Sequence, residues 1–448
     1  MKKLFGTDGI RGVAGDFLTK ELATSVGNAL ARILSKNNDK PKVMIGTDTR
    51  ISKDMLKDAL VNGLTLGGCD VFDIGVISTP AVAYLTLLKN ADAGIMISAS
   101  HNTFEYNGIK IFGADGFKLS DDDEAKIESA VFSEKASFVS NNSGTLIRAE
   151  EFKTDYIKHI KESVPQNLPI SIVVDCANGS AATTAKAIFE GSCKRIDYIG
   201  CSPDGKNIND GCGSTALGML KKAVTDSDAD LGIAFDGDAD RFLAIDENGN
   251  EIDGDHVLAI LSLMLKDEGK LKKNTAVGTV MSNFGFSKFC ADNGIEFVST
   301  KVGDRYVLEE MEKSGYSLGG EQSGHVIIRE LATTGDGQLT AVYMLKAIEK
   351  YNKSHRELAS ILKKYPQRMI NVSANAEQKT LFTTSEEIKT IIADAENSLS
   401  GKGRILVRPS GTEPLVRIMV ESTDEKETSE VCEEVARRIQ QILSASER

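Results

Sequence analysis

Short apolar runs alternate with amphipathic segments between residues 43 and 320, and this alternation dominates the chain. A short run closed by glycine or polar residues is typical of a buried strand, whereas apolar residues three and four positions apart indicate a helix. Strands that alternate with helices predict α/β units with largely parallel sheets. The pattern therefore predicts an α/β fold.

The order of the predicted elements repeats along the chain. A first round has strands at 43–46, 71–74 and 95–97, with helices at 18–34, 53–66 and 80–88. A second round has strands at 172–175, 196–199 and 231–235, and a third has strands at 276–280, 296–298 and 316–320. Repetition over this length without recognisable residue identity indicates three related domains rather than a solenoid.

The length of the chain predicts several domains, since 448 residues exceed one ordinary core of about 150 residues. Polar or proline-containing stretches predict boundaries that give domains 1–153, 154–253, 254–366 and 367–448. The last segment mixes strands and helices in a different order. We therefore expect three related α/β domains with mixed, largely parallel sheets, followed by a smaller α+β domain.

The composition narrows the classes of partner. Apolar residues make up 41% of the chain and charged residues 26%, as in soluble globular proteins. The formal net charge of −12 argues against nucleic acid or an anionic membrane as partner, because both would repel the chain. An anionic ligand would need a local basic pocket. We expect a monomer or homodimer that binds a small molecule.

Cysteine usage and hydropathy bear on the compartment. The seven cysteines are scattered and show no CxxC spacing, which indicates reduced thiols rather than a disulfide framework or a zinc site. The amino terminus carries no apolar segment, and no run approaches membrane-spanning length. The protein is therefore expected to be cytoplasmic.

The third strand of each round ends in polar residues that carry chemistry: Ser98-Ala99-Ser100-His101-Asn102, Asp236-Gly237-Asp238-Ala239-Asp240-Arg241 and Glu321-Gln322-Ser323-Gly324-His325. Ligands in open α/β sheets bind beyond the carboxyl ends of the strands. Three such domains are expected to face one shared central cleft, with Ser100 as the candidate nucleophile. An ordinary turn after the strand is the alternative for the Ser100 segment.

Asp236, Asp238 and Asp240 alternate after an apolar strand, and an extended backbone would turn their carboxylates to one side. Their mutual repulsion requires a cation, and oxygen ligands select a hard ion such as Mg²⁺. A calcium loop is disfavoured because Arg241 stands at the sixth position, where glycine is needed. A solvated acidic turn and a phosphatase with Asp236 as nucleophile remain as alternatives.

Other polar segments are candidates for substrate binding. Arg11 lies in the glycine-rich segment 6–12, and Lys110 follows the serine loop closely enough to neutralise a phosphoryl group. The loop at 408–417 has hydroxyls, a glycine and flanking arginines that can wrap a phosphate. The alternating residues of 321–325 suit sugar hydroxyls, and the polar loop 301–306 is a further candidate.

These segments together resemble the α-D-phosphohexomutases. The resemblance runs from Phe5-Gly6-Thr7-Asp8-Gly9-Ile10-Arg11-Gly12 to Arg408-Pro409-Ser410-Gly411-Thr412-Glu413-Pro414, with all four motifs of the family in order. It implies four domains around a cleft, a phosphorylated serine, bound Mg²⁺ and a hexose 1,6-bisphosphate as intermediate or activator. The opening segment and Gln322 are most similar to the members that act on glucosamine phosphate.

The predicted site residues follow from these matches and from the polar loops. The predicted metal ligands are Ser100, Asp236, Asp238 and Asp240. The predicted catalytic set is Ser100, His101, Lys110, Arg11, Arg241 and His325. The predicted substrate contacts are Gly303, Asp304, Arg305, Glu321, Ser323, His325, Arg408, Ser410, Gly411, Thr412 and Arg417. Thr103 departs from the family, which usually has proline there, so the serine loop is expected to be less rigid.

The reaction implied by the resemblance is the reversible conversion of glucosamine 6-phosphate to glucosamine 1-phosphate, which feeds UDP-N-acetylglucosamine and cell-wall synthesis. Phospho-Ser100 would give its phosphoryl group to the free hydroxyl, and the bisphosphate would turn round and return the other phosphate. Closure of the fourth domain is expected to exclude water. A phosphomannomutase or phosphoglucomutase, a Mg²⁺-dependent sugar phosphatase and a silent sugar-phosphate sensor are the alternatives.

Overall fold

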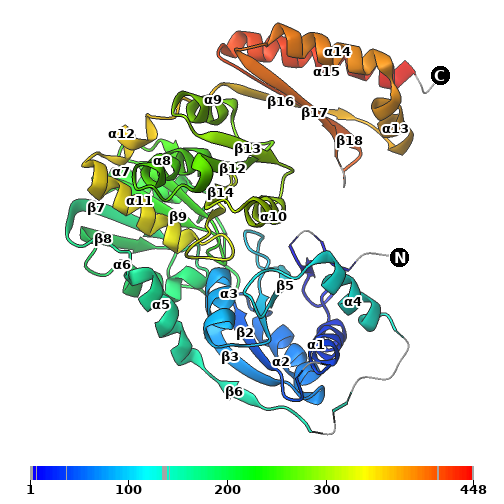
Figure 1. Cartoon of the computed structure of the whole chain (residues 1–448), viewed down its shortest axis with the longest axis vertical. Helices are drawn as coiled ribbons and strands as arrows, with labels where there is room; N and C mark the ends of the chain where they lie inside the picture. The colour runs from blue at the N-terminus through cyan, green and yellow to red at the C-terminus, as the bar shows by residue number, and fades with distance from the viewer. Residues whose placement is uncertain are drawn as a thin grey trace. The chain divides into compact units, whose positions relative to one another are not determined.

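The computed structural model describes residues 4–6, 8–36, 38–133, 139–140, 142–410 and 413–445. The chain forms two compact units, one of Met1–Met281 with Gly294–Ile361, the other of Ser282–Asn293 with Leu362–Arg448. Figure 1 colours both units by position along the chain. The four-domain division at 153, 253 and 366 stays a prediction.

The first sheet of the larger unit has the strand order β1-β5-β4-β2-β3-β6. Its strands are β1 (Ile10–Val13), β2 (Lys42–Thr47), β3 (Asp70–Val76), β4 (Ala93–Ile97), β5 (Tyr106–Gly113) and β6 (Leu146–Arg148). The helices are α1 (Lys20–Leu34), α2 (Lys53–Leu66), α3 (Thr79–Leu88) and α4 (Asp121–Val131). Helices α1 and α2 pack closely, and Gly63 permits this because it has no side chain. A Cβ at Gly63 would lie 2.1 Å from the carbonyl oxygen of Thr24.

The second sheet has the order β11-β10-β9-β7-β8. Its strands are β7 (Leu168–Asp175), β8 (Cys193–Ile199), β9 (Leu231–Phe235), β10 (Phe242–Asp246) and β11 (Glu251–Ile252). The helical segments are η1 (Glu150–Phe152), α5 (Lys153–Lys161), η2 (Ser180–Thr183), α6 (Ala185–Phe189) and α7 (Gly218–Asp226).

The third sheet has the order β13-β12-β14-β15. Its strands are β12 (Thr275–Thr279), β13 (Glu296–Thr300), β14 (Leu318–Gly320) and β15 (Val326–Ile328). The helical segments are α8 (Gly254–Asp267), η3 (Lys272–Asn274), α10 (Asp304–Ser314), α11 (Gly337–Tyr351) and α12 (His355–Ala359), and α11 lies beside α8 (Figure 1).

The three sheets share one core topology, which confirms the repeat inferred from the sequence. The orders β5-β4-β2-β3, β10-β9-β7-β8 and β15-β14-β12-β13 are equivalent. In each, the first three strands of the round are parallel and a fourth returns antiparallel to the third. The sequence reading did not resolve these return strands. They make each polar segment after a third strand the connection of a β-hairpin.

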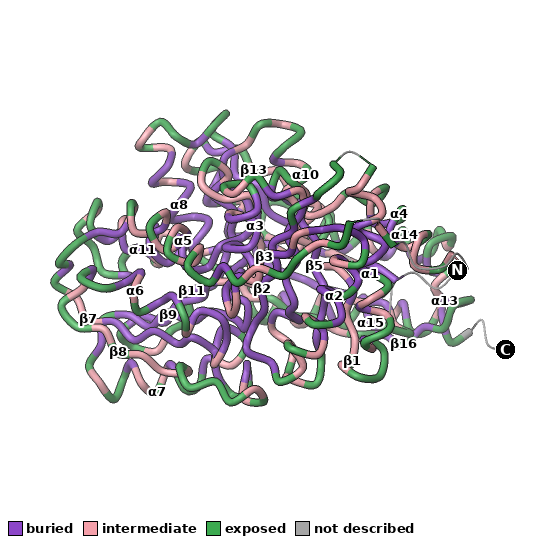
Figure 2. The backbone as a smooth tube through the Cα atoms, turned by 90° about the horizontal axis from the view of Figure 1, so that it is seen from below, coloured by how far each residue is buried: buried purple, intermediate pink, exposed green. Residues whose placement is uncertain are grey.

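Burial explains why the third strands hold their loops firmly. Every residue of β4 and β9 is buried, and the same holds for β10. The central strands appear as purple runs in Figure 2, whereas much of the surface loops is green. A strand buried on both faces has a strongly specified register, which fixes the position of each residue in the loop at its end.

The second unit is α+β, as expected. Strands β16 (Gln367–Ser373), β17 (Gly403–Pro409) and β18 (Leu415–Ser422) form an antiparallel sheet of order β16-β18-β17 with α13 (Ala376–Thr384), α14 (Glu386–Ser398) and α15 (Glu425–Ala445). Helix α9 (Phe284–Asp292) belongs to this unit. The Glu421 carboxylate accepts from Asn283 Nδ2 at 3.2 Å and from the Phe284 amide at 2.9 Å.

Among the described helices, none combines the length and the hydropathy that a membrane crossing requires. All seven cysteines, which lie in the described ranges, are free thiols.

A buried carboxyl joins the second and third rounds. Asp336 caps α11 by accepting the Leu339 amide at 3.0 Å, and the Tyr156 hydroxyl of α5 donates to both its oxygens at 3.0 and 3.1 Å. Burial raises the pKa of Asp336 to about 6 from an ordinary value of 3.8, against the hydrogen bonds, which lower it. The folded state therefore binds a proton that the unfolded state has lost between these values.

We expect Asp336→Asn to become more stable relative to the natural chain as the pH rises. The ionised carboxyl costs stability above about pH 6, by about 3 kcal/mol for a shift of this size, and asparagine removes that cost while it still caps the helix. Thermal melting of both proteins at about pH 4.5 and about pH 7.5 tests this. A difference in melting temperature that is the same at both pH values would contradict it.

Candidate active site

The Ser100 loop connects β4 to β5 and brings the serine hydroxyl to the second sheet's polar loop. Ser100 is buried, with a left-handed φ of 50°. Its Oγ donates to Asp236 Oδ2 at 2.6 Å, and its amide donates to Ser98 Oγ at 2.9 Å. The predicted nucleophile therefore lies against the predicted metal ligands.

The three carboxylates come together, although not as the sequence reading supposed. Asp236, Asp238 and Asp240 each offer an oxygen within 4.8 Å of the others, and all three are buried. The expected extended backbone is wrong, because the segment after β9 forms a tight turn in which Ala239 has a φ of 55°. In an extended strand, alternate residues lie about 7 Å apart along the chain. The turn instead brings the three carboxylates within 4.8 Å of one another.

The acidic triad has the donors that a metal ion requires. Asp238 Oδ1 and Asp240 Oδ1 are buried and accept no hydrogen bond from the described residues. An unpartnered buried carboxylate oxygen is costly unless a cation approaches it. Carboxylate oxygens suit hard divalent ions, so the triad could bind such a metal.

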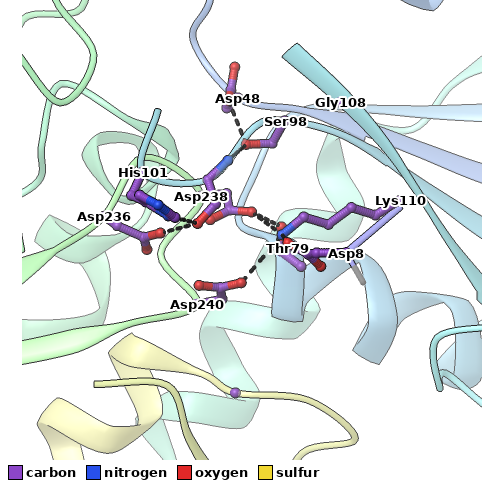
Figure 3. Close-up of polar contacts among 12 residues, drawn as sticks. Asp8, Asp48, Thr79, Ser98, His101, Gly108, Lys110, Asp236, Asp238 and Asp240 are labelled. Carbon is purple, nitrogen blue, oxygen red and sulfur yellow. Dashed lines mark hydrogen bonds and ion pairs between the residues drawn. The ribbon is translucent and has the colours of Figure 1, made fainter. Parts of the chain in front are cut away.

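Lys110 reaches the triad because β5 runs antiparallel to β4, which places it opposite Met96 in the interior of the sheet. Its Nζ lies 2.8 Å from Asp238 Oδ2, 3.1 Å from Asp8 Oδ2 and 3.4 Å from Asp240 Oδ2 (Figure 3). Burial alone would lower the pKa of Lys110, but the carboxylates of Asp238, Asp8 and Asp240 hold it well above its ordinary value. Lys110 is therefore a fixed positive charge.

The pKa values of two carboxylates of the triad are shifted in opposite directions. Burial, followed by the charges of Asp240 and Asp238, raises the pKa of Asp236 well above its ordinary value. Burial acts the same way on Asp240, but Lys110, His325 and Arg241 lower its pKa well below the ordinary value. These neighbours favour the charged form of Asp240.

Two histidines flank the triad in different states. Burial, with the charges of Arg241 and Arg11, lowers the pKa of His101 to about 4, so this ring is neutral at pH 7. His325 Nδ1 lies 3.7 Å from Asp240 Oδ1, and its Nε2 accepts the Gly335 amide at 3.0 Å. Burial opposes protonation of His325, but Asp240 and Asp304 together raise its pKa. In the neutral ring the proton lies on Nδ1, facing Asp240.

The two predicted arginines lie close to the same loops. Arg241 Nε lies 3.9 Å from Asp240 Oδ1, and its amide donates to Asp236 Oδ1 at 3.2 Å. Arg11 on β1 forms an ion pair with Asp8 and lies 3.4 Å from Asn102 Oδ1 in the serine loop.

The third loop approaches the triad through His325, while its other members have local partners. Glu321 Oε1 accepts the Gly303 amide at 2.9 Å, and Ser323 is half-buried in the turn. Asp304 forms an ion pair with Lys118 and lies 3.6 Å from His325 Nε2. The Gln322 amide donates to Asp255 Oδ2 at 3.1 Å.

Arg305 points away from the triad, toward α4. It lies 2.7 Å from Asp121, 3.4 Å from Glu124 and 3.1 Å from Glu309. With Lys118, Asp304 and His325 it lines a cavity of about 800 Å³ between α4 and α10.

The predicted phosphate loop lies in the second unit, between β17 and β18. Arg408 and Arg417 face each other across these strands, and Arg417 forms an ion pair with Glu413. Ser410 Oγ accepts the Glu413 amide at 3.1 Å. Lys379 of α13, which the sequence reading missed, donates to the Ser410 carbonyl at 2.7 Å. Gly411 and Thr412 lie outside the described residues.

The sequence reading also missed residues that support the two central loops. Thr79, at the start of α3, donates from Oγ1 to Asp238 Oδ2 at 2.5 Å and from its amide to the Asp238 carbonyl at 2.9 Å. Asp48 and Arg50, which directly follow β2, belong to the same group of missed residues. Their position at the carboxyl end of the strand next to β4 was a usable signal.

Profiles of known families match nearly the whole chain. The match to "Phosphoglucomutase/phosphomannomutase, alpha/beta/alpha domain I" spans residues 2–138, domain II spans 154–249, domain III spans 253–365 and the C-terminal domain spans 369–438. A phosphoglucosamine mutase of Thermoanaerobacter sp. (strain X514) is 47% identical over 447 residues, which cover 99% of this chain and 100% of that protein.

Solved structures share the fold. A phosphoglucomutase/phosphomannomutase family protein from Burkholderia thailandensis has a TM-score of 0.81 at 23% identity, covering 99% of this chain and 98% of that chain. The N-acetylphosphoglucosamine mutase of Aspergillus fumigatus, solved in complex with GlcNAc-6P and magnesium, has a TM-score of 0.67 at 15% identity, with coverages of 98% and 95%.

The repeated sheets and the four profile matches define the chain as a phosphohexomutase. Its similarity over the full length is to one branch of that class. The chain belongs to the phosphoglucosamine mutase family and is an enzyme of the isomerase class.

We expect Gly237→Ala to reduce turnover strongly, because a Cβ there would lie 2.6 Å from the Ser100 carbonyl oxygen and 2.8 Å from Asn209 Nδ2. The added methyl must push the acidic turn away from the serine loop, and misplacement by about 1 Å can cost about a hundredfold in rate. Steady-state kinetics measure the effect. Gly218→Ala, where a Cβ meets open space, is the matched control and should retain activity. Equal activity of the two variants would contradict the expected contact.

Proposed function

We propose that the chain interconverts glucosamine 6-phosphate and glucosamine 1-phosphate through a phosphorylated Ser100. The observation that carries this proposal is the buried Ser100 hydroxyl, which lies 2.6 Å from a carboxylate of the acidic triad. The chain that holds it is 47% identical to a phosphoglucosamine mutase over 447 residues. A phosphoserine that transfers its phosphoryl group needs a cation nearby to neutralise the charge of that group, and the acidic triad offers a site for one.

The transfer proceeds in two balanced halves. The free hydroxyl oxygen of the sugar phosphate attacks the phosphorus on Ser100, a sugar O–P bond forms, and the serine O–P bond breaks. The hydroxyl proton passes to a base. The hexose 1,6-bisphosphate then turns round. In the second half the Ser100 oxygen attacks the other phosphorus, a serine O–P bond forms, the sugar O–P bond breaks, and the proton passes from the base to the released sugar oxygen. The bisphosphate is thus both intermediate and activator.

The triad and Ser100 would hold Mg²⁺. Oxygen donors favour this ion, and two buried carboxylate oxygens are free of hydrogen bonds from the described residues. When bound, the metal withdraws negative charge from the transferring phosphoryl group. The Aspergillus fumigatus N-acetylphosphoglucosamine mutase was solved with magnesium and GlcNAc-6P, and a variant of that enzyme was solved with glucose 1,6-bisphosphate.

The surrounding side chains divide the remaining work. Lys110 stays protonated among carboxylates and stabilises developing charge, as do Arg11 and Arg241. His101 Nδ1 lies 3.4 Å from Ser100 Oγ in a neutral ring, and His325 lies beside Asp240. We assign the proton of the attacking hydroxyl to the neutral ring of His101, and a charge-stabilising role to His325, whose ring nitrogens face Asp240 and the Gly335 amide.

Substrate contacts come from the remaining polar loops. Glu321, Ser323 and His325 would hold sugar hydroxyls, with Gly303, Asp304 and Arg305 beside them. The donors at the β17–β18 loop would bind the distal phosphate: Arg408, Ser410, Gly411, Thr412 and Arg417. The small-molecule substrate, the net charge of −12 and the free thiols favour an enzyme of the cytoplasm, without nucleic acid or membrane as partner.

Ser100→Ala should abolish isomerisation and leave the fold intact, since only one buried hydroxyl is lost. Intact mass should show a phosphate on the natural chain that phosphatase removes, and none on the variant. An assay with glucosamine 6-phosphate and its 1,6-bisphosphate measures turnover, with mannose and glucose phosphates tested beside it. Isomerisation by Ser100→Ala would contradict a phosphoserine mechanism, and release of inorganic phosphate by the natural chain would favour a phosphatase.

Removal of divalent metal with a chelator should stop turnover, and Mg²⁺ should restore it. Asp238→Asn should weaken Mg²⁺ binding, measured by calorimetry, by about tenfold or more, because one charged ligand is lost. Asp226→Asn is the matched control, since this carboxylate is exposed and pairs with Lys222 outside the site. Unchanged Mg²⁺ affinity in Asp238→Asn would contradict the proposed metal site.

A further inference from the structure

A buried arginine, Arg50, follows β2 and donates most of its side-chain hydrogen bonds to backbone carbonyls of the serine loop. The side chain of Arg50 is fully buried, and its Nη2 donates to the Ser100 carbonyl at 3.0 Å and to the Asn102 carbonyl at 2.8 Å. Its Nη1 donates to the Thr103 carbonyl. Nε donates to Asp48 Oδ2 at 2.8 Å. A guanidinium present only to neutralise Asp48 would not need three loop carbonyls.

Asp48 extends this contact to the other side of the loop. Ser98 Oγ donates to Asp48 Oδ2 at 2.6 Å, and the Ser100 amide in turn donates to Ser98 Oγ at 2.9 Å. The Arg50 amide donates to Asp48 Oδ1 at 2.9 Å. The amide and the carbonyl of Ser100 are thus both tied to the end of β2.

A second side chain makes the same contacts from the second sheet's round. Asn209 lies in the connection between β8 and α7 and is almost fully buried. Its Nδ2 donates to the Ser100 carbonyl at 2.9 Å and to the Asn102 carbonyl at 3.0 Å. The backbone N–H of Asn209 donates to the Ala177 carbonyl at 2.9 Å. Two loop carbonyls therefore receive one donor from Arg50 and one from Asn209.

The loop needs such support for two reasons. Ser100 has a left-handed φ of 50°, which costs a residue with a Cβ about 1–2 kcal/mol. Thr103 stands where the family usually has proline, so the loop lacks the restraint that a pyrrolidine ring supplies. Hydrogen bonds to successive carbonyls restrain the same backbone from outside.

We propose that Arg50 and Asn209 are positioning residues that clamp the Ser100–Thr103 backbone from two rounds of the repeat and take the place of the missing proline. They touch neither the reacting atoms nor the acidic triad; they fix where the Ser100 hydroxyl points. This proposal rests on the proposed role of Ser100 in phosphoryl transfer, because a loop that carried no chemistry would not require this restraint.

The experiment removes the Asn209 amide without disturbing the backbone. Asn209 has a φ of 57°, so Asn209→Gly keeps a conformation that glycine adopts freely. Asn352→Gly is the matched control, because Asn352 has a φ of 48° at the exposed end of α11. Arg50→Lys is a second variant that keeps a cation beside Asp48 and loses the guanidinium fork.

Each variant is also made with Thr103→Pro. Thr103 is exposed, and its nitrogen makes no hydrogen bond within the described chain, so proline removes no backbone hydrogen bond and only the side-chain hydrogen bond to Glu105 is lost. If the clamp and a proline restrain the same backbone, the effect of Asn209→Gly must shrink when proline is present.

Steady-state kinetics with glucosamine 6-phosphate and glucosamine 1,6-bisphosphate give kcat and KM, and melting gives stability. We expect kcat of Asn209→Gly and of Arg50→Lys to fall between about tenfold and about a hundredfold, with KM changed less than about twofold. Asn352→Gly should match the natural chain. The loss in Asn209→Gly should become clearly smaller in the Thr103→Pro background.

Three results would overturn the clamp: an unchanged kcat in Asn209→Gly, an equal loss in Asn352→Gly, or the same fold loss with and without proline. If the natural chain itself fails to isomerise, the proposed function fails instead. The clamp is then decided by hydrogen exchange of the 99–104 peptide, which Asn209→Gly must accelerate and Asn352→Gly must not.

Discussion

The rest of the site depends on one constraint: three buried carboxylates lie close together in a single turn. A buried charge without a partner costs several kcal/mol, so each carboxylate of the triad must meet a cation or a donor. Lys110 comes from the first sheet, Arg241 from the acidic turn itself and His325 from the third sheet. Polar groups from all three rounds of the repeat therefore face the triad, and the electrostatics of the triad favour the assembled arrangement of the larger unit.

The return strands explain how these groups reach one another. Without β5, Lys110 would lie on a connection to the next helix rather than in the sheet interior opposite Met96. Without β15, the ring of His325 would have no strand to place it beside Asp240. The hairpin after each third strand therefore contributes side chains to the candidate site.

Much of this arrangement could be predicted from the sequence. The apolar runs located β2, β4 and β9 closely, and the polar residues after the third strands identified Ser100, the triad and His325. The strand expected at 316–320 is β14, but the return strand β15 could not be found by periodicity, because a strand of three residues carries too little pattern. The grouping of α9 with the second unit depends on packing, which periodicity does not report.

Residues that act through backbone contacts escaped for a different reason. Alternation in Asp236, Asp238 and Asp240 suggested a strand, but Ala239 in a left-handed conformation makes a turn, and no periodicity reports such a dihedral angle. Arg50 and Asn209 lie far apart in the sequence and meet only at the carbonyls of Ser100 and Asn102. Their shared role depends on packing between two sheets, which a single sequence does not encode in any local pattern.

The equivalent hairpins also separate the tasks of the enzyme into interchangeable parts. The two ends of each loop are held by adjacent antiparallel strands, whose spacing of about 5 Å does not depend on what the loop contains. If the third hairpin holds the sugar as proposed, changes at Glu321 and Ser323 would alter which sugar is recognised while His325 keeps its place beside Asp240. One scaffold of this kind can acquire new substrates while its phosphoryl chemistry is inherited unchanged.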